Sequence, residues 1–202
     1  MEKKYELTEE TIEWTAFTNA FVITNGSQNV FTLHRIKALK DFSDVKKGDL
    51  GGFVEKESNL AQDGDCWVYD DAVVYDNAEI YGNAKVFNNA EIGGYARVYD
   101  EATVWNNAAV YNKAVICDNA AVYDNVTVYG NAKVCDSADV YDNAFIYGHA
   151  EVGGNANVCG YARVHDEASV CDNAAVYGYA CVYGKAIICG NVNVGDYAAI
   201  GE

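Results

Sequence analysis

Histidine and cysteine are the residues of this chain best suited to chemistry. The three histidines, His34, His149 and His165, could exchange protons near neutral pH. The seven cysteines could bind metal ions or pair as disulfides, but none follow the C-x2-C spacing of the usual zinc frameworks. What these side chains can do depends on the elements that hold them.

A six-residue repeat organises most of the chain. From Val68 to Ile200 every sixth residue is Val or Ile, which gives 23 positions without an exception. Alanine stands four residues after each of them in 20 of 22 cases, and Val126 and Val192 are the other two. Residues six apart fall on different faces of an α-helix, whereas residues two apart share one face of a strand. The repeat therefore predicts short strands with Val and Ala on the inner face.

The remaining positions of each repeat predict a corner. In the phrase A-x-V-Y-D-N, the first corner residue is Asp in 10 of 23 repeats and Gly in 9. Gly and Asn tolerate positive φ, and Asp bonds to the backbone of a turn. A strand this short cannot bury its apolar side alone, so the repeats must coil and stack. Parallel stacking at roughly 4.8 Å pairs the backbone of neighbouring coils.

These repeats resemble the motif of the hexapeptide-repeat left-handed β-helix family, an aliphatic residue followed by small or polar ones. The resemblance covers residues 68–202 and implies three repeats per triangular coil. The expected fold is all-β: a left-handed parallel β-helix of nearly eight coils with a small N-terminal β-rich cap. The lead-in DFSDVKKGDLGGFVEKESNLAQDGDCWVYDDA is similar to uncharacterised hexapeptide-repeat proteins of bacteria and prophages, which are commonly labelled transferases.

We expect two parts, with residues 1–53 as a cap over the first coil and residues 54–202 as the β-helix. Within the cap, FVITNGSQNVFTLHRIKAL alternates apolar and polar residues around Asn25-Gly26, which predicts a hairpin. The repeat runs to Ile200, so the last coil is expected to be uncapped and to expose a strand edge. Such an edge favours self-association as a dimer or trimer.

If three repeats form a coil, residues eighteen apart stack, and the residue after each Val or Ile belongs to one of three outward columns. Two columns carry aromatic rings, which are expected either to stiffen the coil by stacking or to form a binding interface. The interface candidates of the first column are Tyr69, Phe87, Trp105, Tyr123, Tyr141 and Tyr177. Those of the second column are Tyr75, Tyr111, Tyr129, Tyr147 and Tyr183.

The third column is a thiol column with the cysteines Cys117, Cys135, Cys171 and Cys189. Cys117 and Cys135 lie one coil apart, as do Cys171 and Cys189, a spacing that permits a disulfide. The N-terminus has no apolar signal segment, which predicts a cytoplasmic protein with reduced thiols. Beside the thiols lies an expected acidic corner of Asp100, Asp118, Asp136 and Asp172. A flat column suits tetrahedral ligation poorly, so we expect no metal site, with the four cysteines as weak candidates.

The resemblance also implies an enzymatic alternative. Many relatives of this fold transfer acyl groups from acyl-CoA or acyl-carrier protein, with a histidine as general base. An acyl-CoA-dependent acyltransferase would have His149, at a corner, and His165, in an aromatic column, as weak catalytic candidates. However, no repeat is interrupted by a loop, and residues 68–202 contain 6 cationic side chains against 18 acidic ones. We therefore lean away from an enzyme and expect no cofactor.

The formal charge of −16 disfavours direct binding to nucleic acid or to an anionic membrane surface. A slender acidic rod could instead mimic nucleic acid and occupy a basic host defence protein, or its charge could simply keep a tyrosine-rich rod soluble. The favoured function is a non-enzymatic, self-associating scaffold or protein-binding module. The resemblance points to a phage or prophage origin.

Overall fold

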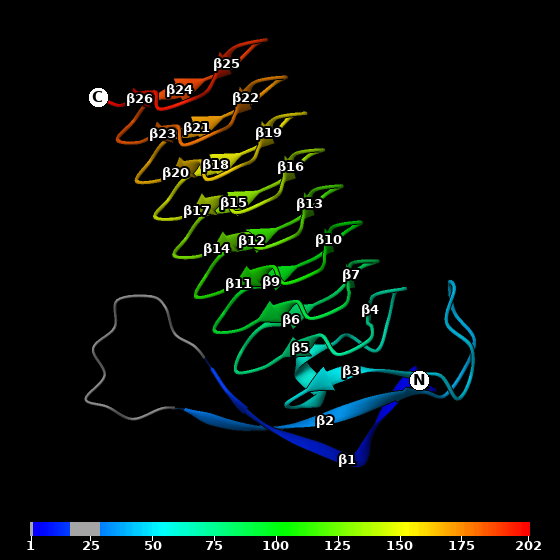
Figure 1. Cartoon of the computed structure of the whole chain (residues 1–202). Coiled ribbons are helices and arrows are strands. Elements are labelled where there is room, and N and C mark those ends of the chain that lie inside the picture. Colours follow the sequence, from blue (N-terminus) through cyan, green and yellow to red (C-terminus); the bar gives the residue numbers. More distant parts are fainter. Residues whose placement is uncertain (1, 17–28) are drawn as a thin grey trace.

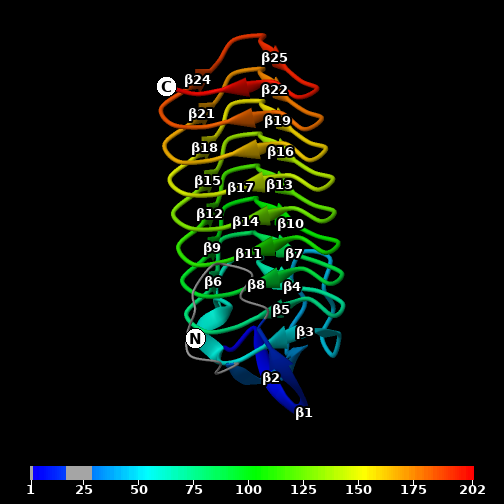
Figure 2. The ribbon, with the colours of Figure 1, turned by 60° about the vertical axis from the view of Figure 1, so that its left-hand side comes forward.

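The computed structural model describes residues 2–16 and 29–202 and is built almost entirely from β-strands (Figure 1). The expected left-handed parallel β-helix of about eight coils is confirmed. The coils stack into one column, with the N-terminal strands at one end and the C-terminus at the other (Figure 2). Within the described residues, no helix is long and apolar enough to cross a membrane.

The repeat strands form three parallel faces, because each strand pairs with the strand one coil further along. The first face contains β4 (Trp67–Val68), β7 (Lys85–Val86), β10 (Thr103–Val104), β13 (Ala121–Val122), β16 (Asp139–Val140), β19 (Asn157–Val158), β22 (Ala175–Val176) and β25 (Asn193–Val194). The second face contains β5 (Val73–Val74), β8 (Glu91–Ile92), β11 (Ala109–Val110), β14 (Thr127–Val128), β17 (Phe145–Ile146), β20 (Arg163–Val164), β23 (Cys181–Val182) and β26 (Ala199–Ile200). The third face contains β6 (Glu79–Ile80), β9 (Arg97–Val98), β12 (Val115–Ile116), β15 (Lys133–Val134), β18 (Glu151–Val152), β21 (Ser169–Val170) and β24 (Ile187–Ile188).

The inner residues of the repeat make the core, as their spacing predicts. On β14, Val128 is fully buried, and so is Val126 in the slot that usually holds Ala. Thr127 lies between them, points outward and is half-buried. Fully burying a Val side chain stabilises the fold by about 1.5 kcal/mol or more, so the core gains its stability from many thin, repeated layers.

The corners have the backbone that the Asp, Asn and Gly pattern predicts. Asp124 and Asp142 both have φ 62°, in the left-handed region that most residues avoid. The Asp124 carboxylate accepts the N–H of Asp142 one coil further along at 3.4 Å, and Asp142 accepts that of Gly160 at 3.1 Å. An Asp at the first corner position therefore adds a hydrogen bond between coils.

The N-terminal strands extend the second face beyond the first coil. They are β1 (Tyr5–Thr15), β2 (Val30–Ala38) and β3 (Leu50–Val54), followed by the 3-10 turn η1 (Glu57–Asn59). β1 pairs antiparallel with β2, β2 antiparallel with β3, and β3 parallel with β5. The turn predicted at Asn25-Gly26 lies outside the described residues. The division after residue 53 stays a prediction, and β3 runs across it.

The edge of the first coil is covered by side chains from the N-terminal segment. The buried ammonium group of Lys4 donates to the carbonyl oxygens of Gly64 at 3.2 Å and Cys66 at 2.9 Å. The rings of Tyr5 and Phe42 pack edge-on against Trp67, with centroids 6.1 and 5.3 Å away. These contacts satisfy the backbone of the edge and close the apolar interior.

A second contact fastens the N-terminal strands to the side of the coil. The Glu91 carboxylate accepts the hydroxyl of Tyr75 at 2.6 Å and the indole N–H of Trp14 at 3.2 Å. The Phe31 ring lies 4.8 Å from the Tyr75 ring. Tyr75, which the sequence places among the interface candidates, is therefore buried against its own chain and is only 4% exposed.

The layered core makes one stability prediction. Val128→Ala should lower the free energy of unfolding by about 2 kcal/mol, because it removes buried methyl groups and leaves a cavity. Chemical denaturation followed by circular dichroism measures this loss. Thr127→Ala on the same strand is the matched control, and its effect should stay within about 0.5 kcal/mol. Equal losses for the two variants would contradict the assignment of inner and outer positions.

The N-terminal segment makes a pH-dependent prediction at Asp44. The hydrogen bond from the Lys85 ammonium at 2.7 Å lowers the pKa of Asp44 from 3.8 to about 2. Because the folded-state pKa is depressed, the contact stabilises the chain above about pH 4 and loses this effect as the pH falls toward 2. Asp44→Asn should therefore lower the free energy of unfolding at pH 6, by less than about 1 kcal/mol for so exposed a pair. Chemical denaturation at pH 6 and at pH 2 measures this loss.

The Asp44 prediction has an internal control. In a Lys85→Gln background the loss caused by Asp44→Asn at pH 6 should shrink, because the cationic partner is gone. A loss that is the same in both backgrounds, or the same at pH 6 and pH 2, would show that this ion pair does not hold the segment.

Candidate functional site

His165 lies in a line of polar contacts on the second face, directly after β20. Its Nδ1 is 3.2 Å from a carboxylate oxygen of Asp166, and its Nε2 is 3.3 Å from the sulfur of Cys181. A carboxylate can only accept a hydrogen bond, so the tautomer that fits this arrangement has its proton on Nδ1 and turns the lone pair of Nε2 toward the thiol. The imidazole of this Asp166–His165–Cys181 cluster is therefore oriented as a base facing sulfur.

Neighbouring coils hold the imidazole in this orientation. Its ring is stacked between Tyr147 and Tyr183, with centroids 4.6 and 5.8 Å away. Asp166 sits at a corner with φ 62°, and its carboxylate also accepts the N–H of Gly184 at 3.2 Å. The Gly184 N–H and His165 together lower the pKa of Asp166, which keeps it ionised. The stacked tyrosine rings fix the plane of the imidazole. The Asp166 carboxylate at the corner fixes which edge of the imidazole carries Nδ1 toward it.

The Cys181 thiol has an environment that keeps it neutral until a base acts on it. Burial raises the pKa of Cys181, and the guanidinium of Arg163 opposes this rise. Arg163 is the register partner of Cys181 on the adjacent strand, so the two side chains leave the same outer face one coil apart. Cys181 itself is half-buried, which leaves part of its side chain open to solvent.

The three predicted histidines have different surroundings. His34 Nδ1 lies 3.2 Å from the carbonyl oxygen of Thr8, within the N-terminal strands. His149 is exposed at its corner, and its imidazole makes no hydrogen bond to any residue that the structure describes. The structure thus brings together His165, Asp166 and Cys181 and leaves His149 apart. Cys181 was missed from sequence because it precedes its Val and so belongs to none of the three columns.

The predicted aromatic columns stack as expected. Trp105 lies 4.4 Å from Tyr123, Tyr123 lies 5.3 Å from Tyr141, and their ring planes are within 7° of parallel. The half-buried members of the two columns are Tyr69, Phe87, Trp105, Tyr111, Tyr123, Tyr129, Tyr141 and Tyr147. Tyr177 and Tyr183 are 41% and 38% exposed. Stacking therefore hides the faces of most rings, and the interface role of these columns stays a prediction.

A further ladder of rings lies at the corner between the first and second faces. Tyr161, Tyr179 and Tyr197 stack at 5.0 and 5.2 Å and are 50%, 55% and 81% exposed. We call these three residues the tyrosine ladder. None of these three residues directly follows a Val or Ile of the repeat, so they belong to none of the three predicted columns. The recurrence of Gly-Tyr-Ala and Asp-Tyr-Ala at intervals of eighteen residues is the signal that could have found the ladder.

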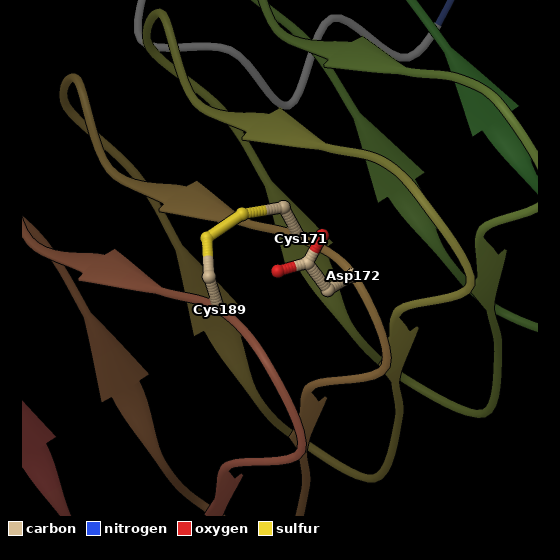
Figure 3. A group of neighbouring side chains, drawn as sticks. All are labelled: Cys171, Asp172 and Cys189. Atoms are coloured by element: carbon tan, nitrogen blue, oxygen red, sulfur yellow. A yellow bond between two sulfur atoms is a disulfide. The ribbon is translucent and has the colours of Figure 1, made fainter.

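The thiol column corrects one expectation. Cys171 and Cys189 are joined by a disulfide across adjacent coils, with the Asp172 carboxylate beside them (Figure 3). The sequence predicted reduced thiols from the apparent compartment, although it allowed the spacing. The geometry favours the bond, because the stacking of coils brings the two Cα atoms to 4.7 Å. These two cysteines are therefore not available as metal ligands in this state.

The other half of the column remains as thiols. Ligand atoms of Asp118, Cys135 and Asp136 lie within 4.8 Å of one another. Burial raises the pKa of Cys117 to about 11 and also raises that of Cys135, so both thiols are protonated near neutral pH. A metal ion would have to displace these protons before binding.

The acidic corner takes part in the stacking of coils. The Asp118 carboxylate accepts the N–H of Asp136 at 3.2 Å, and Asp136 accepts that of Gly154 at 2.8 Å. Asp172 accepts the N–H of Gly190 at 3.0 Å, and Asp100 has the same left-handed backbone, with φ 57°. The carboxylates of Asp118, Asp136 and Asp172 thus already bond neighbouring coils to one another.

Two grooves lie on the third face near the first coils, away from the Asp166–His165–Cys181 cluster. One of about 560 Å³ is lined by residues that include Leu60, Ile80 and Tyr81. The other, of about 280 Å³, has Arg97 and Lys113 in its wall. Neither is lined by His149 or His165.

The disulfide makes a direct chemical prediction. Thiol titration of the denatured protein without reductant should find five free thiols, Cys66, Cys117, Cys135, Cys159 and Cys181. Seven are expected after reduction. Replacing Cys171 and Cys189 together by Ser should lower the free energy of unfolding by up to about 3 kcal/mol, since the bond closes a loop of 18 residues.

Peptide mapping and a matched variant control this prediction. The disulfide-linked peptide should contain Cys171 and Cys189 and no other cysteine. Cys117→Ser with Cys135→Ser removes the equivalent free thiols, and its stability should not respond to reductant. Finding seven free thiols in the unreduced protein would overturn the disulfide.

Comparison with known proteins gives a partial match. No family model matches the chain. The chain is 40% identical over 68 residues to the uncharacterized acetyltransferase YdcK of Escherichia coli (strain K12). The match spans 34% of this chain and 19% of that protein, far less than its full length. Together with the six-residue repeat and the stacked parallel coils, it fits a hexapeptide-repeat, transferase-like protein.

Proposed function

We propose that the protein is a self-associating binding module that makes its contacts through the tyrosine ladder. The observation that carries this proposal is the exposure of stacked rings at a corner where the fold does not need them. Tyr161 and Tyr179, each with a coil on both sides, are still 50% and 55% exposed. Exposed aromatic side chains of this kind are enriched at protein interfaces.

The lower half of the same corner shows what a purely structural column would contain. Below Tyr161 the position is held by asparagines, whose side-chain amides bond to one another from coil to coil. The distances are 3.5 Å from Asn89 to Asn107, 3.2 Å from Asn107 to Asn125 and 3.4 Å from Asn125 to Asn143. Asparagine thus satisfies the corner internally, whereas tyrosine there adds apolar surface that faces outward.

A second copy of the chain is the partner that we infer for this surface. Two rods could lay their ladders against each other around a two-fold axis, so that the same rings serve both sides. Tyr177 and Tyr183 flank the ladder and widen the contact. Each copy carries a formal charge of −16, so repulsion opposes the association and added salt should strengthen it.

Sedimentation at micromolar concentration tests the proposal. The wild-type chain should form a dimer that tightens between 50 and 500 mM salt. Replacing Tyr161 and Tyr179 together by Ser should weaken it on the order of 100-fold, because two buried rings are lost. Tyr95→Ser is the matched control, since Tyr95 is 60% exposed at a different corner and should not affect association.

Two outcomes would contradict the proposal. A wild-type chain that stays monomeric at micromolar concentration has no such interface. Association that survives the double substitution would place the contact elsewhere on the rod. Capture of a basic protein that weakens steeply with salt would favour the alternative of an acidic nucleic-acid mimic.

A second candidate function is acyl transfer. It is favoured by the partial match to an uncharacterized acetyltransferase and by the pairing of His165 with Asp166. In this role His165 would act as general base on an acceptor, and the acyl donor would be a thioester such as acyl-CoA. Transfer of acetyl from acetyl-CoA to an amine acceptor, lost in a His165→Phe variant, would support it.

A further inference from the structure

We propose that Cys181 is a nucleophilic thiol that accepts an acyl group from an activated donor such as a thioester, with His165 as its base and Asp166 positioning His165. The site is independent of the tyrosine-mediated association and goes beyond it. It would also give the acyl-transfer candidate a covalent first step, although the proposal does not require that a second acceptor follows.

The geometry meets the requirements of an activated nucleophile. A base must lie within hydrogen-bond reach of the nucleophile, and a third group must orient that base. His165 Nε2 is 3.3 Å from the Cys181 sulfur, a normal distance for a hydrogen bond that involves sulfur, and the Asp166 carboxylate lies 3.2 Å from Nδ1. His165 and Asp166 are consecutive residues of one coil and Cys181 belongs to the next, so the stacking of coils fixes the spacing of the base and the thiol.

The proton and the acyl group can be followed through the reaction. Nε2 of His165 removes the thiol proton of Cys181 as the sulfur attacks the donor carbonyl carbon. The bond between that carbon and the donor sulfur then breaks, and the departing thiolate takes the proton from the imidazolium. One thioester is exchanged for another and no oxidant is needed. Arg163, the register partner of Cys181 on the adjacent strand, supplies a positive charge on the same face that would favour the oxyanion of the intermediate.

The surroundings single out Cys181 among the five free thiols. Cys66, Cys117 and Cys135 are buried, whereas Cys159 and Cys181 are half-buried. Burial raises the pKa of Cys181, so without its base this thiol would react slowly at neutral pH. Cys159 lies beside Tyr141, whose pKa it raises to about 12, and not beside a histidine. Cys159 is therefore an internal control with similar exposure and no base.

The chain itself supplies conservative replacements for each member of the cluster. His165→Phe keeps a ring in the stack between Tyr147 and Tyr183, as Phe87 does in the first column. Asp166→Asn keeps a residue that tolerates the left-handed corner, as Asn112 does with φ 59°. Cys181→Ala places on β23 the residue that β11 has at Ala109. Unfolding midpoints should confirm that all three variants fold.

Acetylation of the folded full-length protein tests the proposal. The probes are 4-nitrophenyl acetate and acetyl-CoA, and intact-mass and peptide analysis report which residue is modified and how fast. The wild-type chain should gain one acetyl group on Cys181, well before Cys159 reacts. Cys181→Ala should remove this product, and His165→Phe should slow it on the order of 100-fold while leaving the rate at Cys159 unchanged.

Asp166 needs a readout that a merely structural role would not change. In the wild-type protein, nitrogen NMR of His165 should show the tautomer protonated at Nδ1. Asp166→Asn should populate the other tautomer and slow acetylation of Cys181 about tenfold or more at an unchanged unfolding midpoint. An unchanged tautomer, with unchanged acetylation, would remove Asp166 from the site.

Other outcomes separate this proposal from the candidate functions. Acetylation that is absent, equal at Cys159 and Cys181, or unaffected by His165→Phe would overturn the nucleophilic thiol. If Cys181→Ala still transfers acetyl to an amine acceptor, the acyltransferase candidate stands and the covalent step does not. If Cys181 is acetylated and the chain remains monomeric, the thiol site stands and the self-association proposal falls.

Discussion

The structure depends on one interaction, the parallel pairing of each short strand with the strand eighteen residues further along. A two-residue strand has little stability of its own, and each gains it only between a coil below and a coil above. The backbone N–H of Tyr123, for example, bonds to the carbonyl of Val140 at 3.0 Å, and the same bond recurs up the column. This register fixes the core, the corners and the outward ladders together.

The sequence predicts those features of the structure that recur at the same position in every coil. The Val and Ala interior, the left-handed corners and the stacked aromatic columns follow from residue spacing, because every coil has the same shape. Contacts made by the N-terminal segment, which has no repeat, cannot be predicted from residue spacing. Lys4 satisfies carbonyls some sixty residues away, and no periodicity connects it to Gly64 or Cys66. Contacts of this kind depend on how the irregular N-terminal segment folds over the first coil.

The candidate site was only partly predictable for a related reason. His165 was visible as an aromatic-column residue, but Cys181 is sixteen residues away rather than eighteen. Residues eighteen apart hold equal positions in successive coils, whereas the contact between His165 and Cys181 runs diagonally between different positions. The Cys171–Cys189 disulfide shows the opposite case. The spacing of eighteen residues permits the bond, whereas the expected cytoplasmic location, which predicts reduced thiols, carries no information about how close the two sulfurs lie.

The interior of the coils is filled by buried Val, Ile and Ala, so the side chains that could bind or react lie on the outer faces and corners. The tyrosine ladder and the Asp166–His165–Cys181 cluster border each other, since Cys181 follows Tyr179 by two residues. Both lie in the upper coils, whereas the N-terminal strands cover the second face at Tyr75. The upper part of that face is thus the region where exposed rings, a thiol and a base occur together.

Small-angle X-ray scattering as a function of concentration tests the central claim most directly, because it separates the length of a rod from its cross-section. If two copies associate through the tyrosine ladder, the scattering mass should double while the cross-section widens and the rods overlap along much of their length. A doubled length with an unchanged cross-section would mean end-to-end contact. Scattering of a single rod at all concentrations would contradict the account as well.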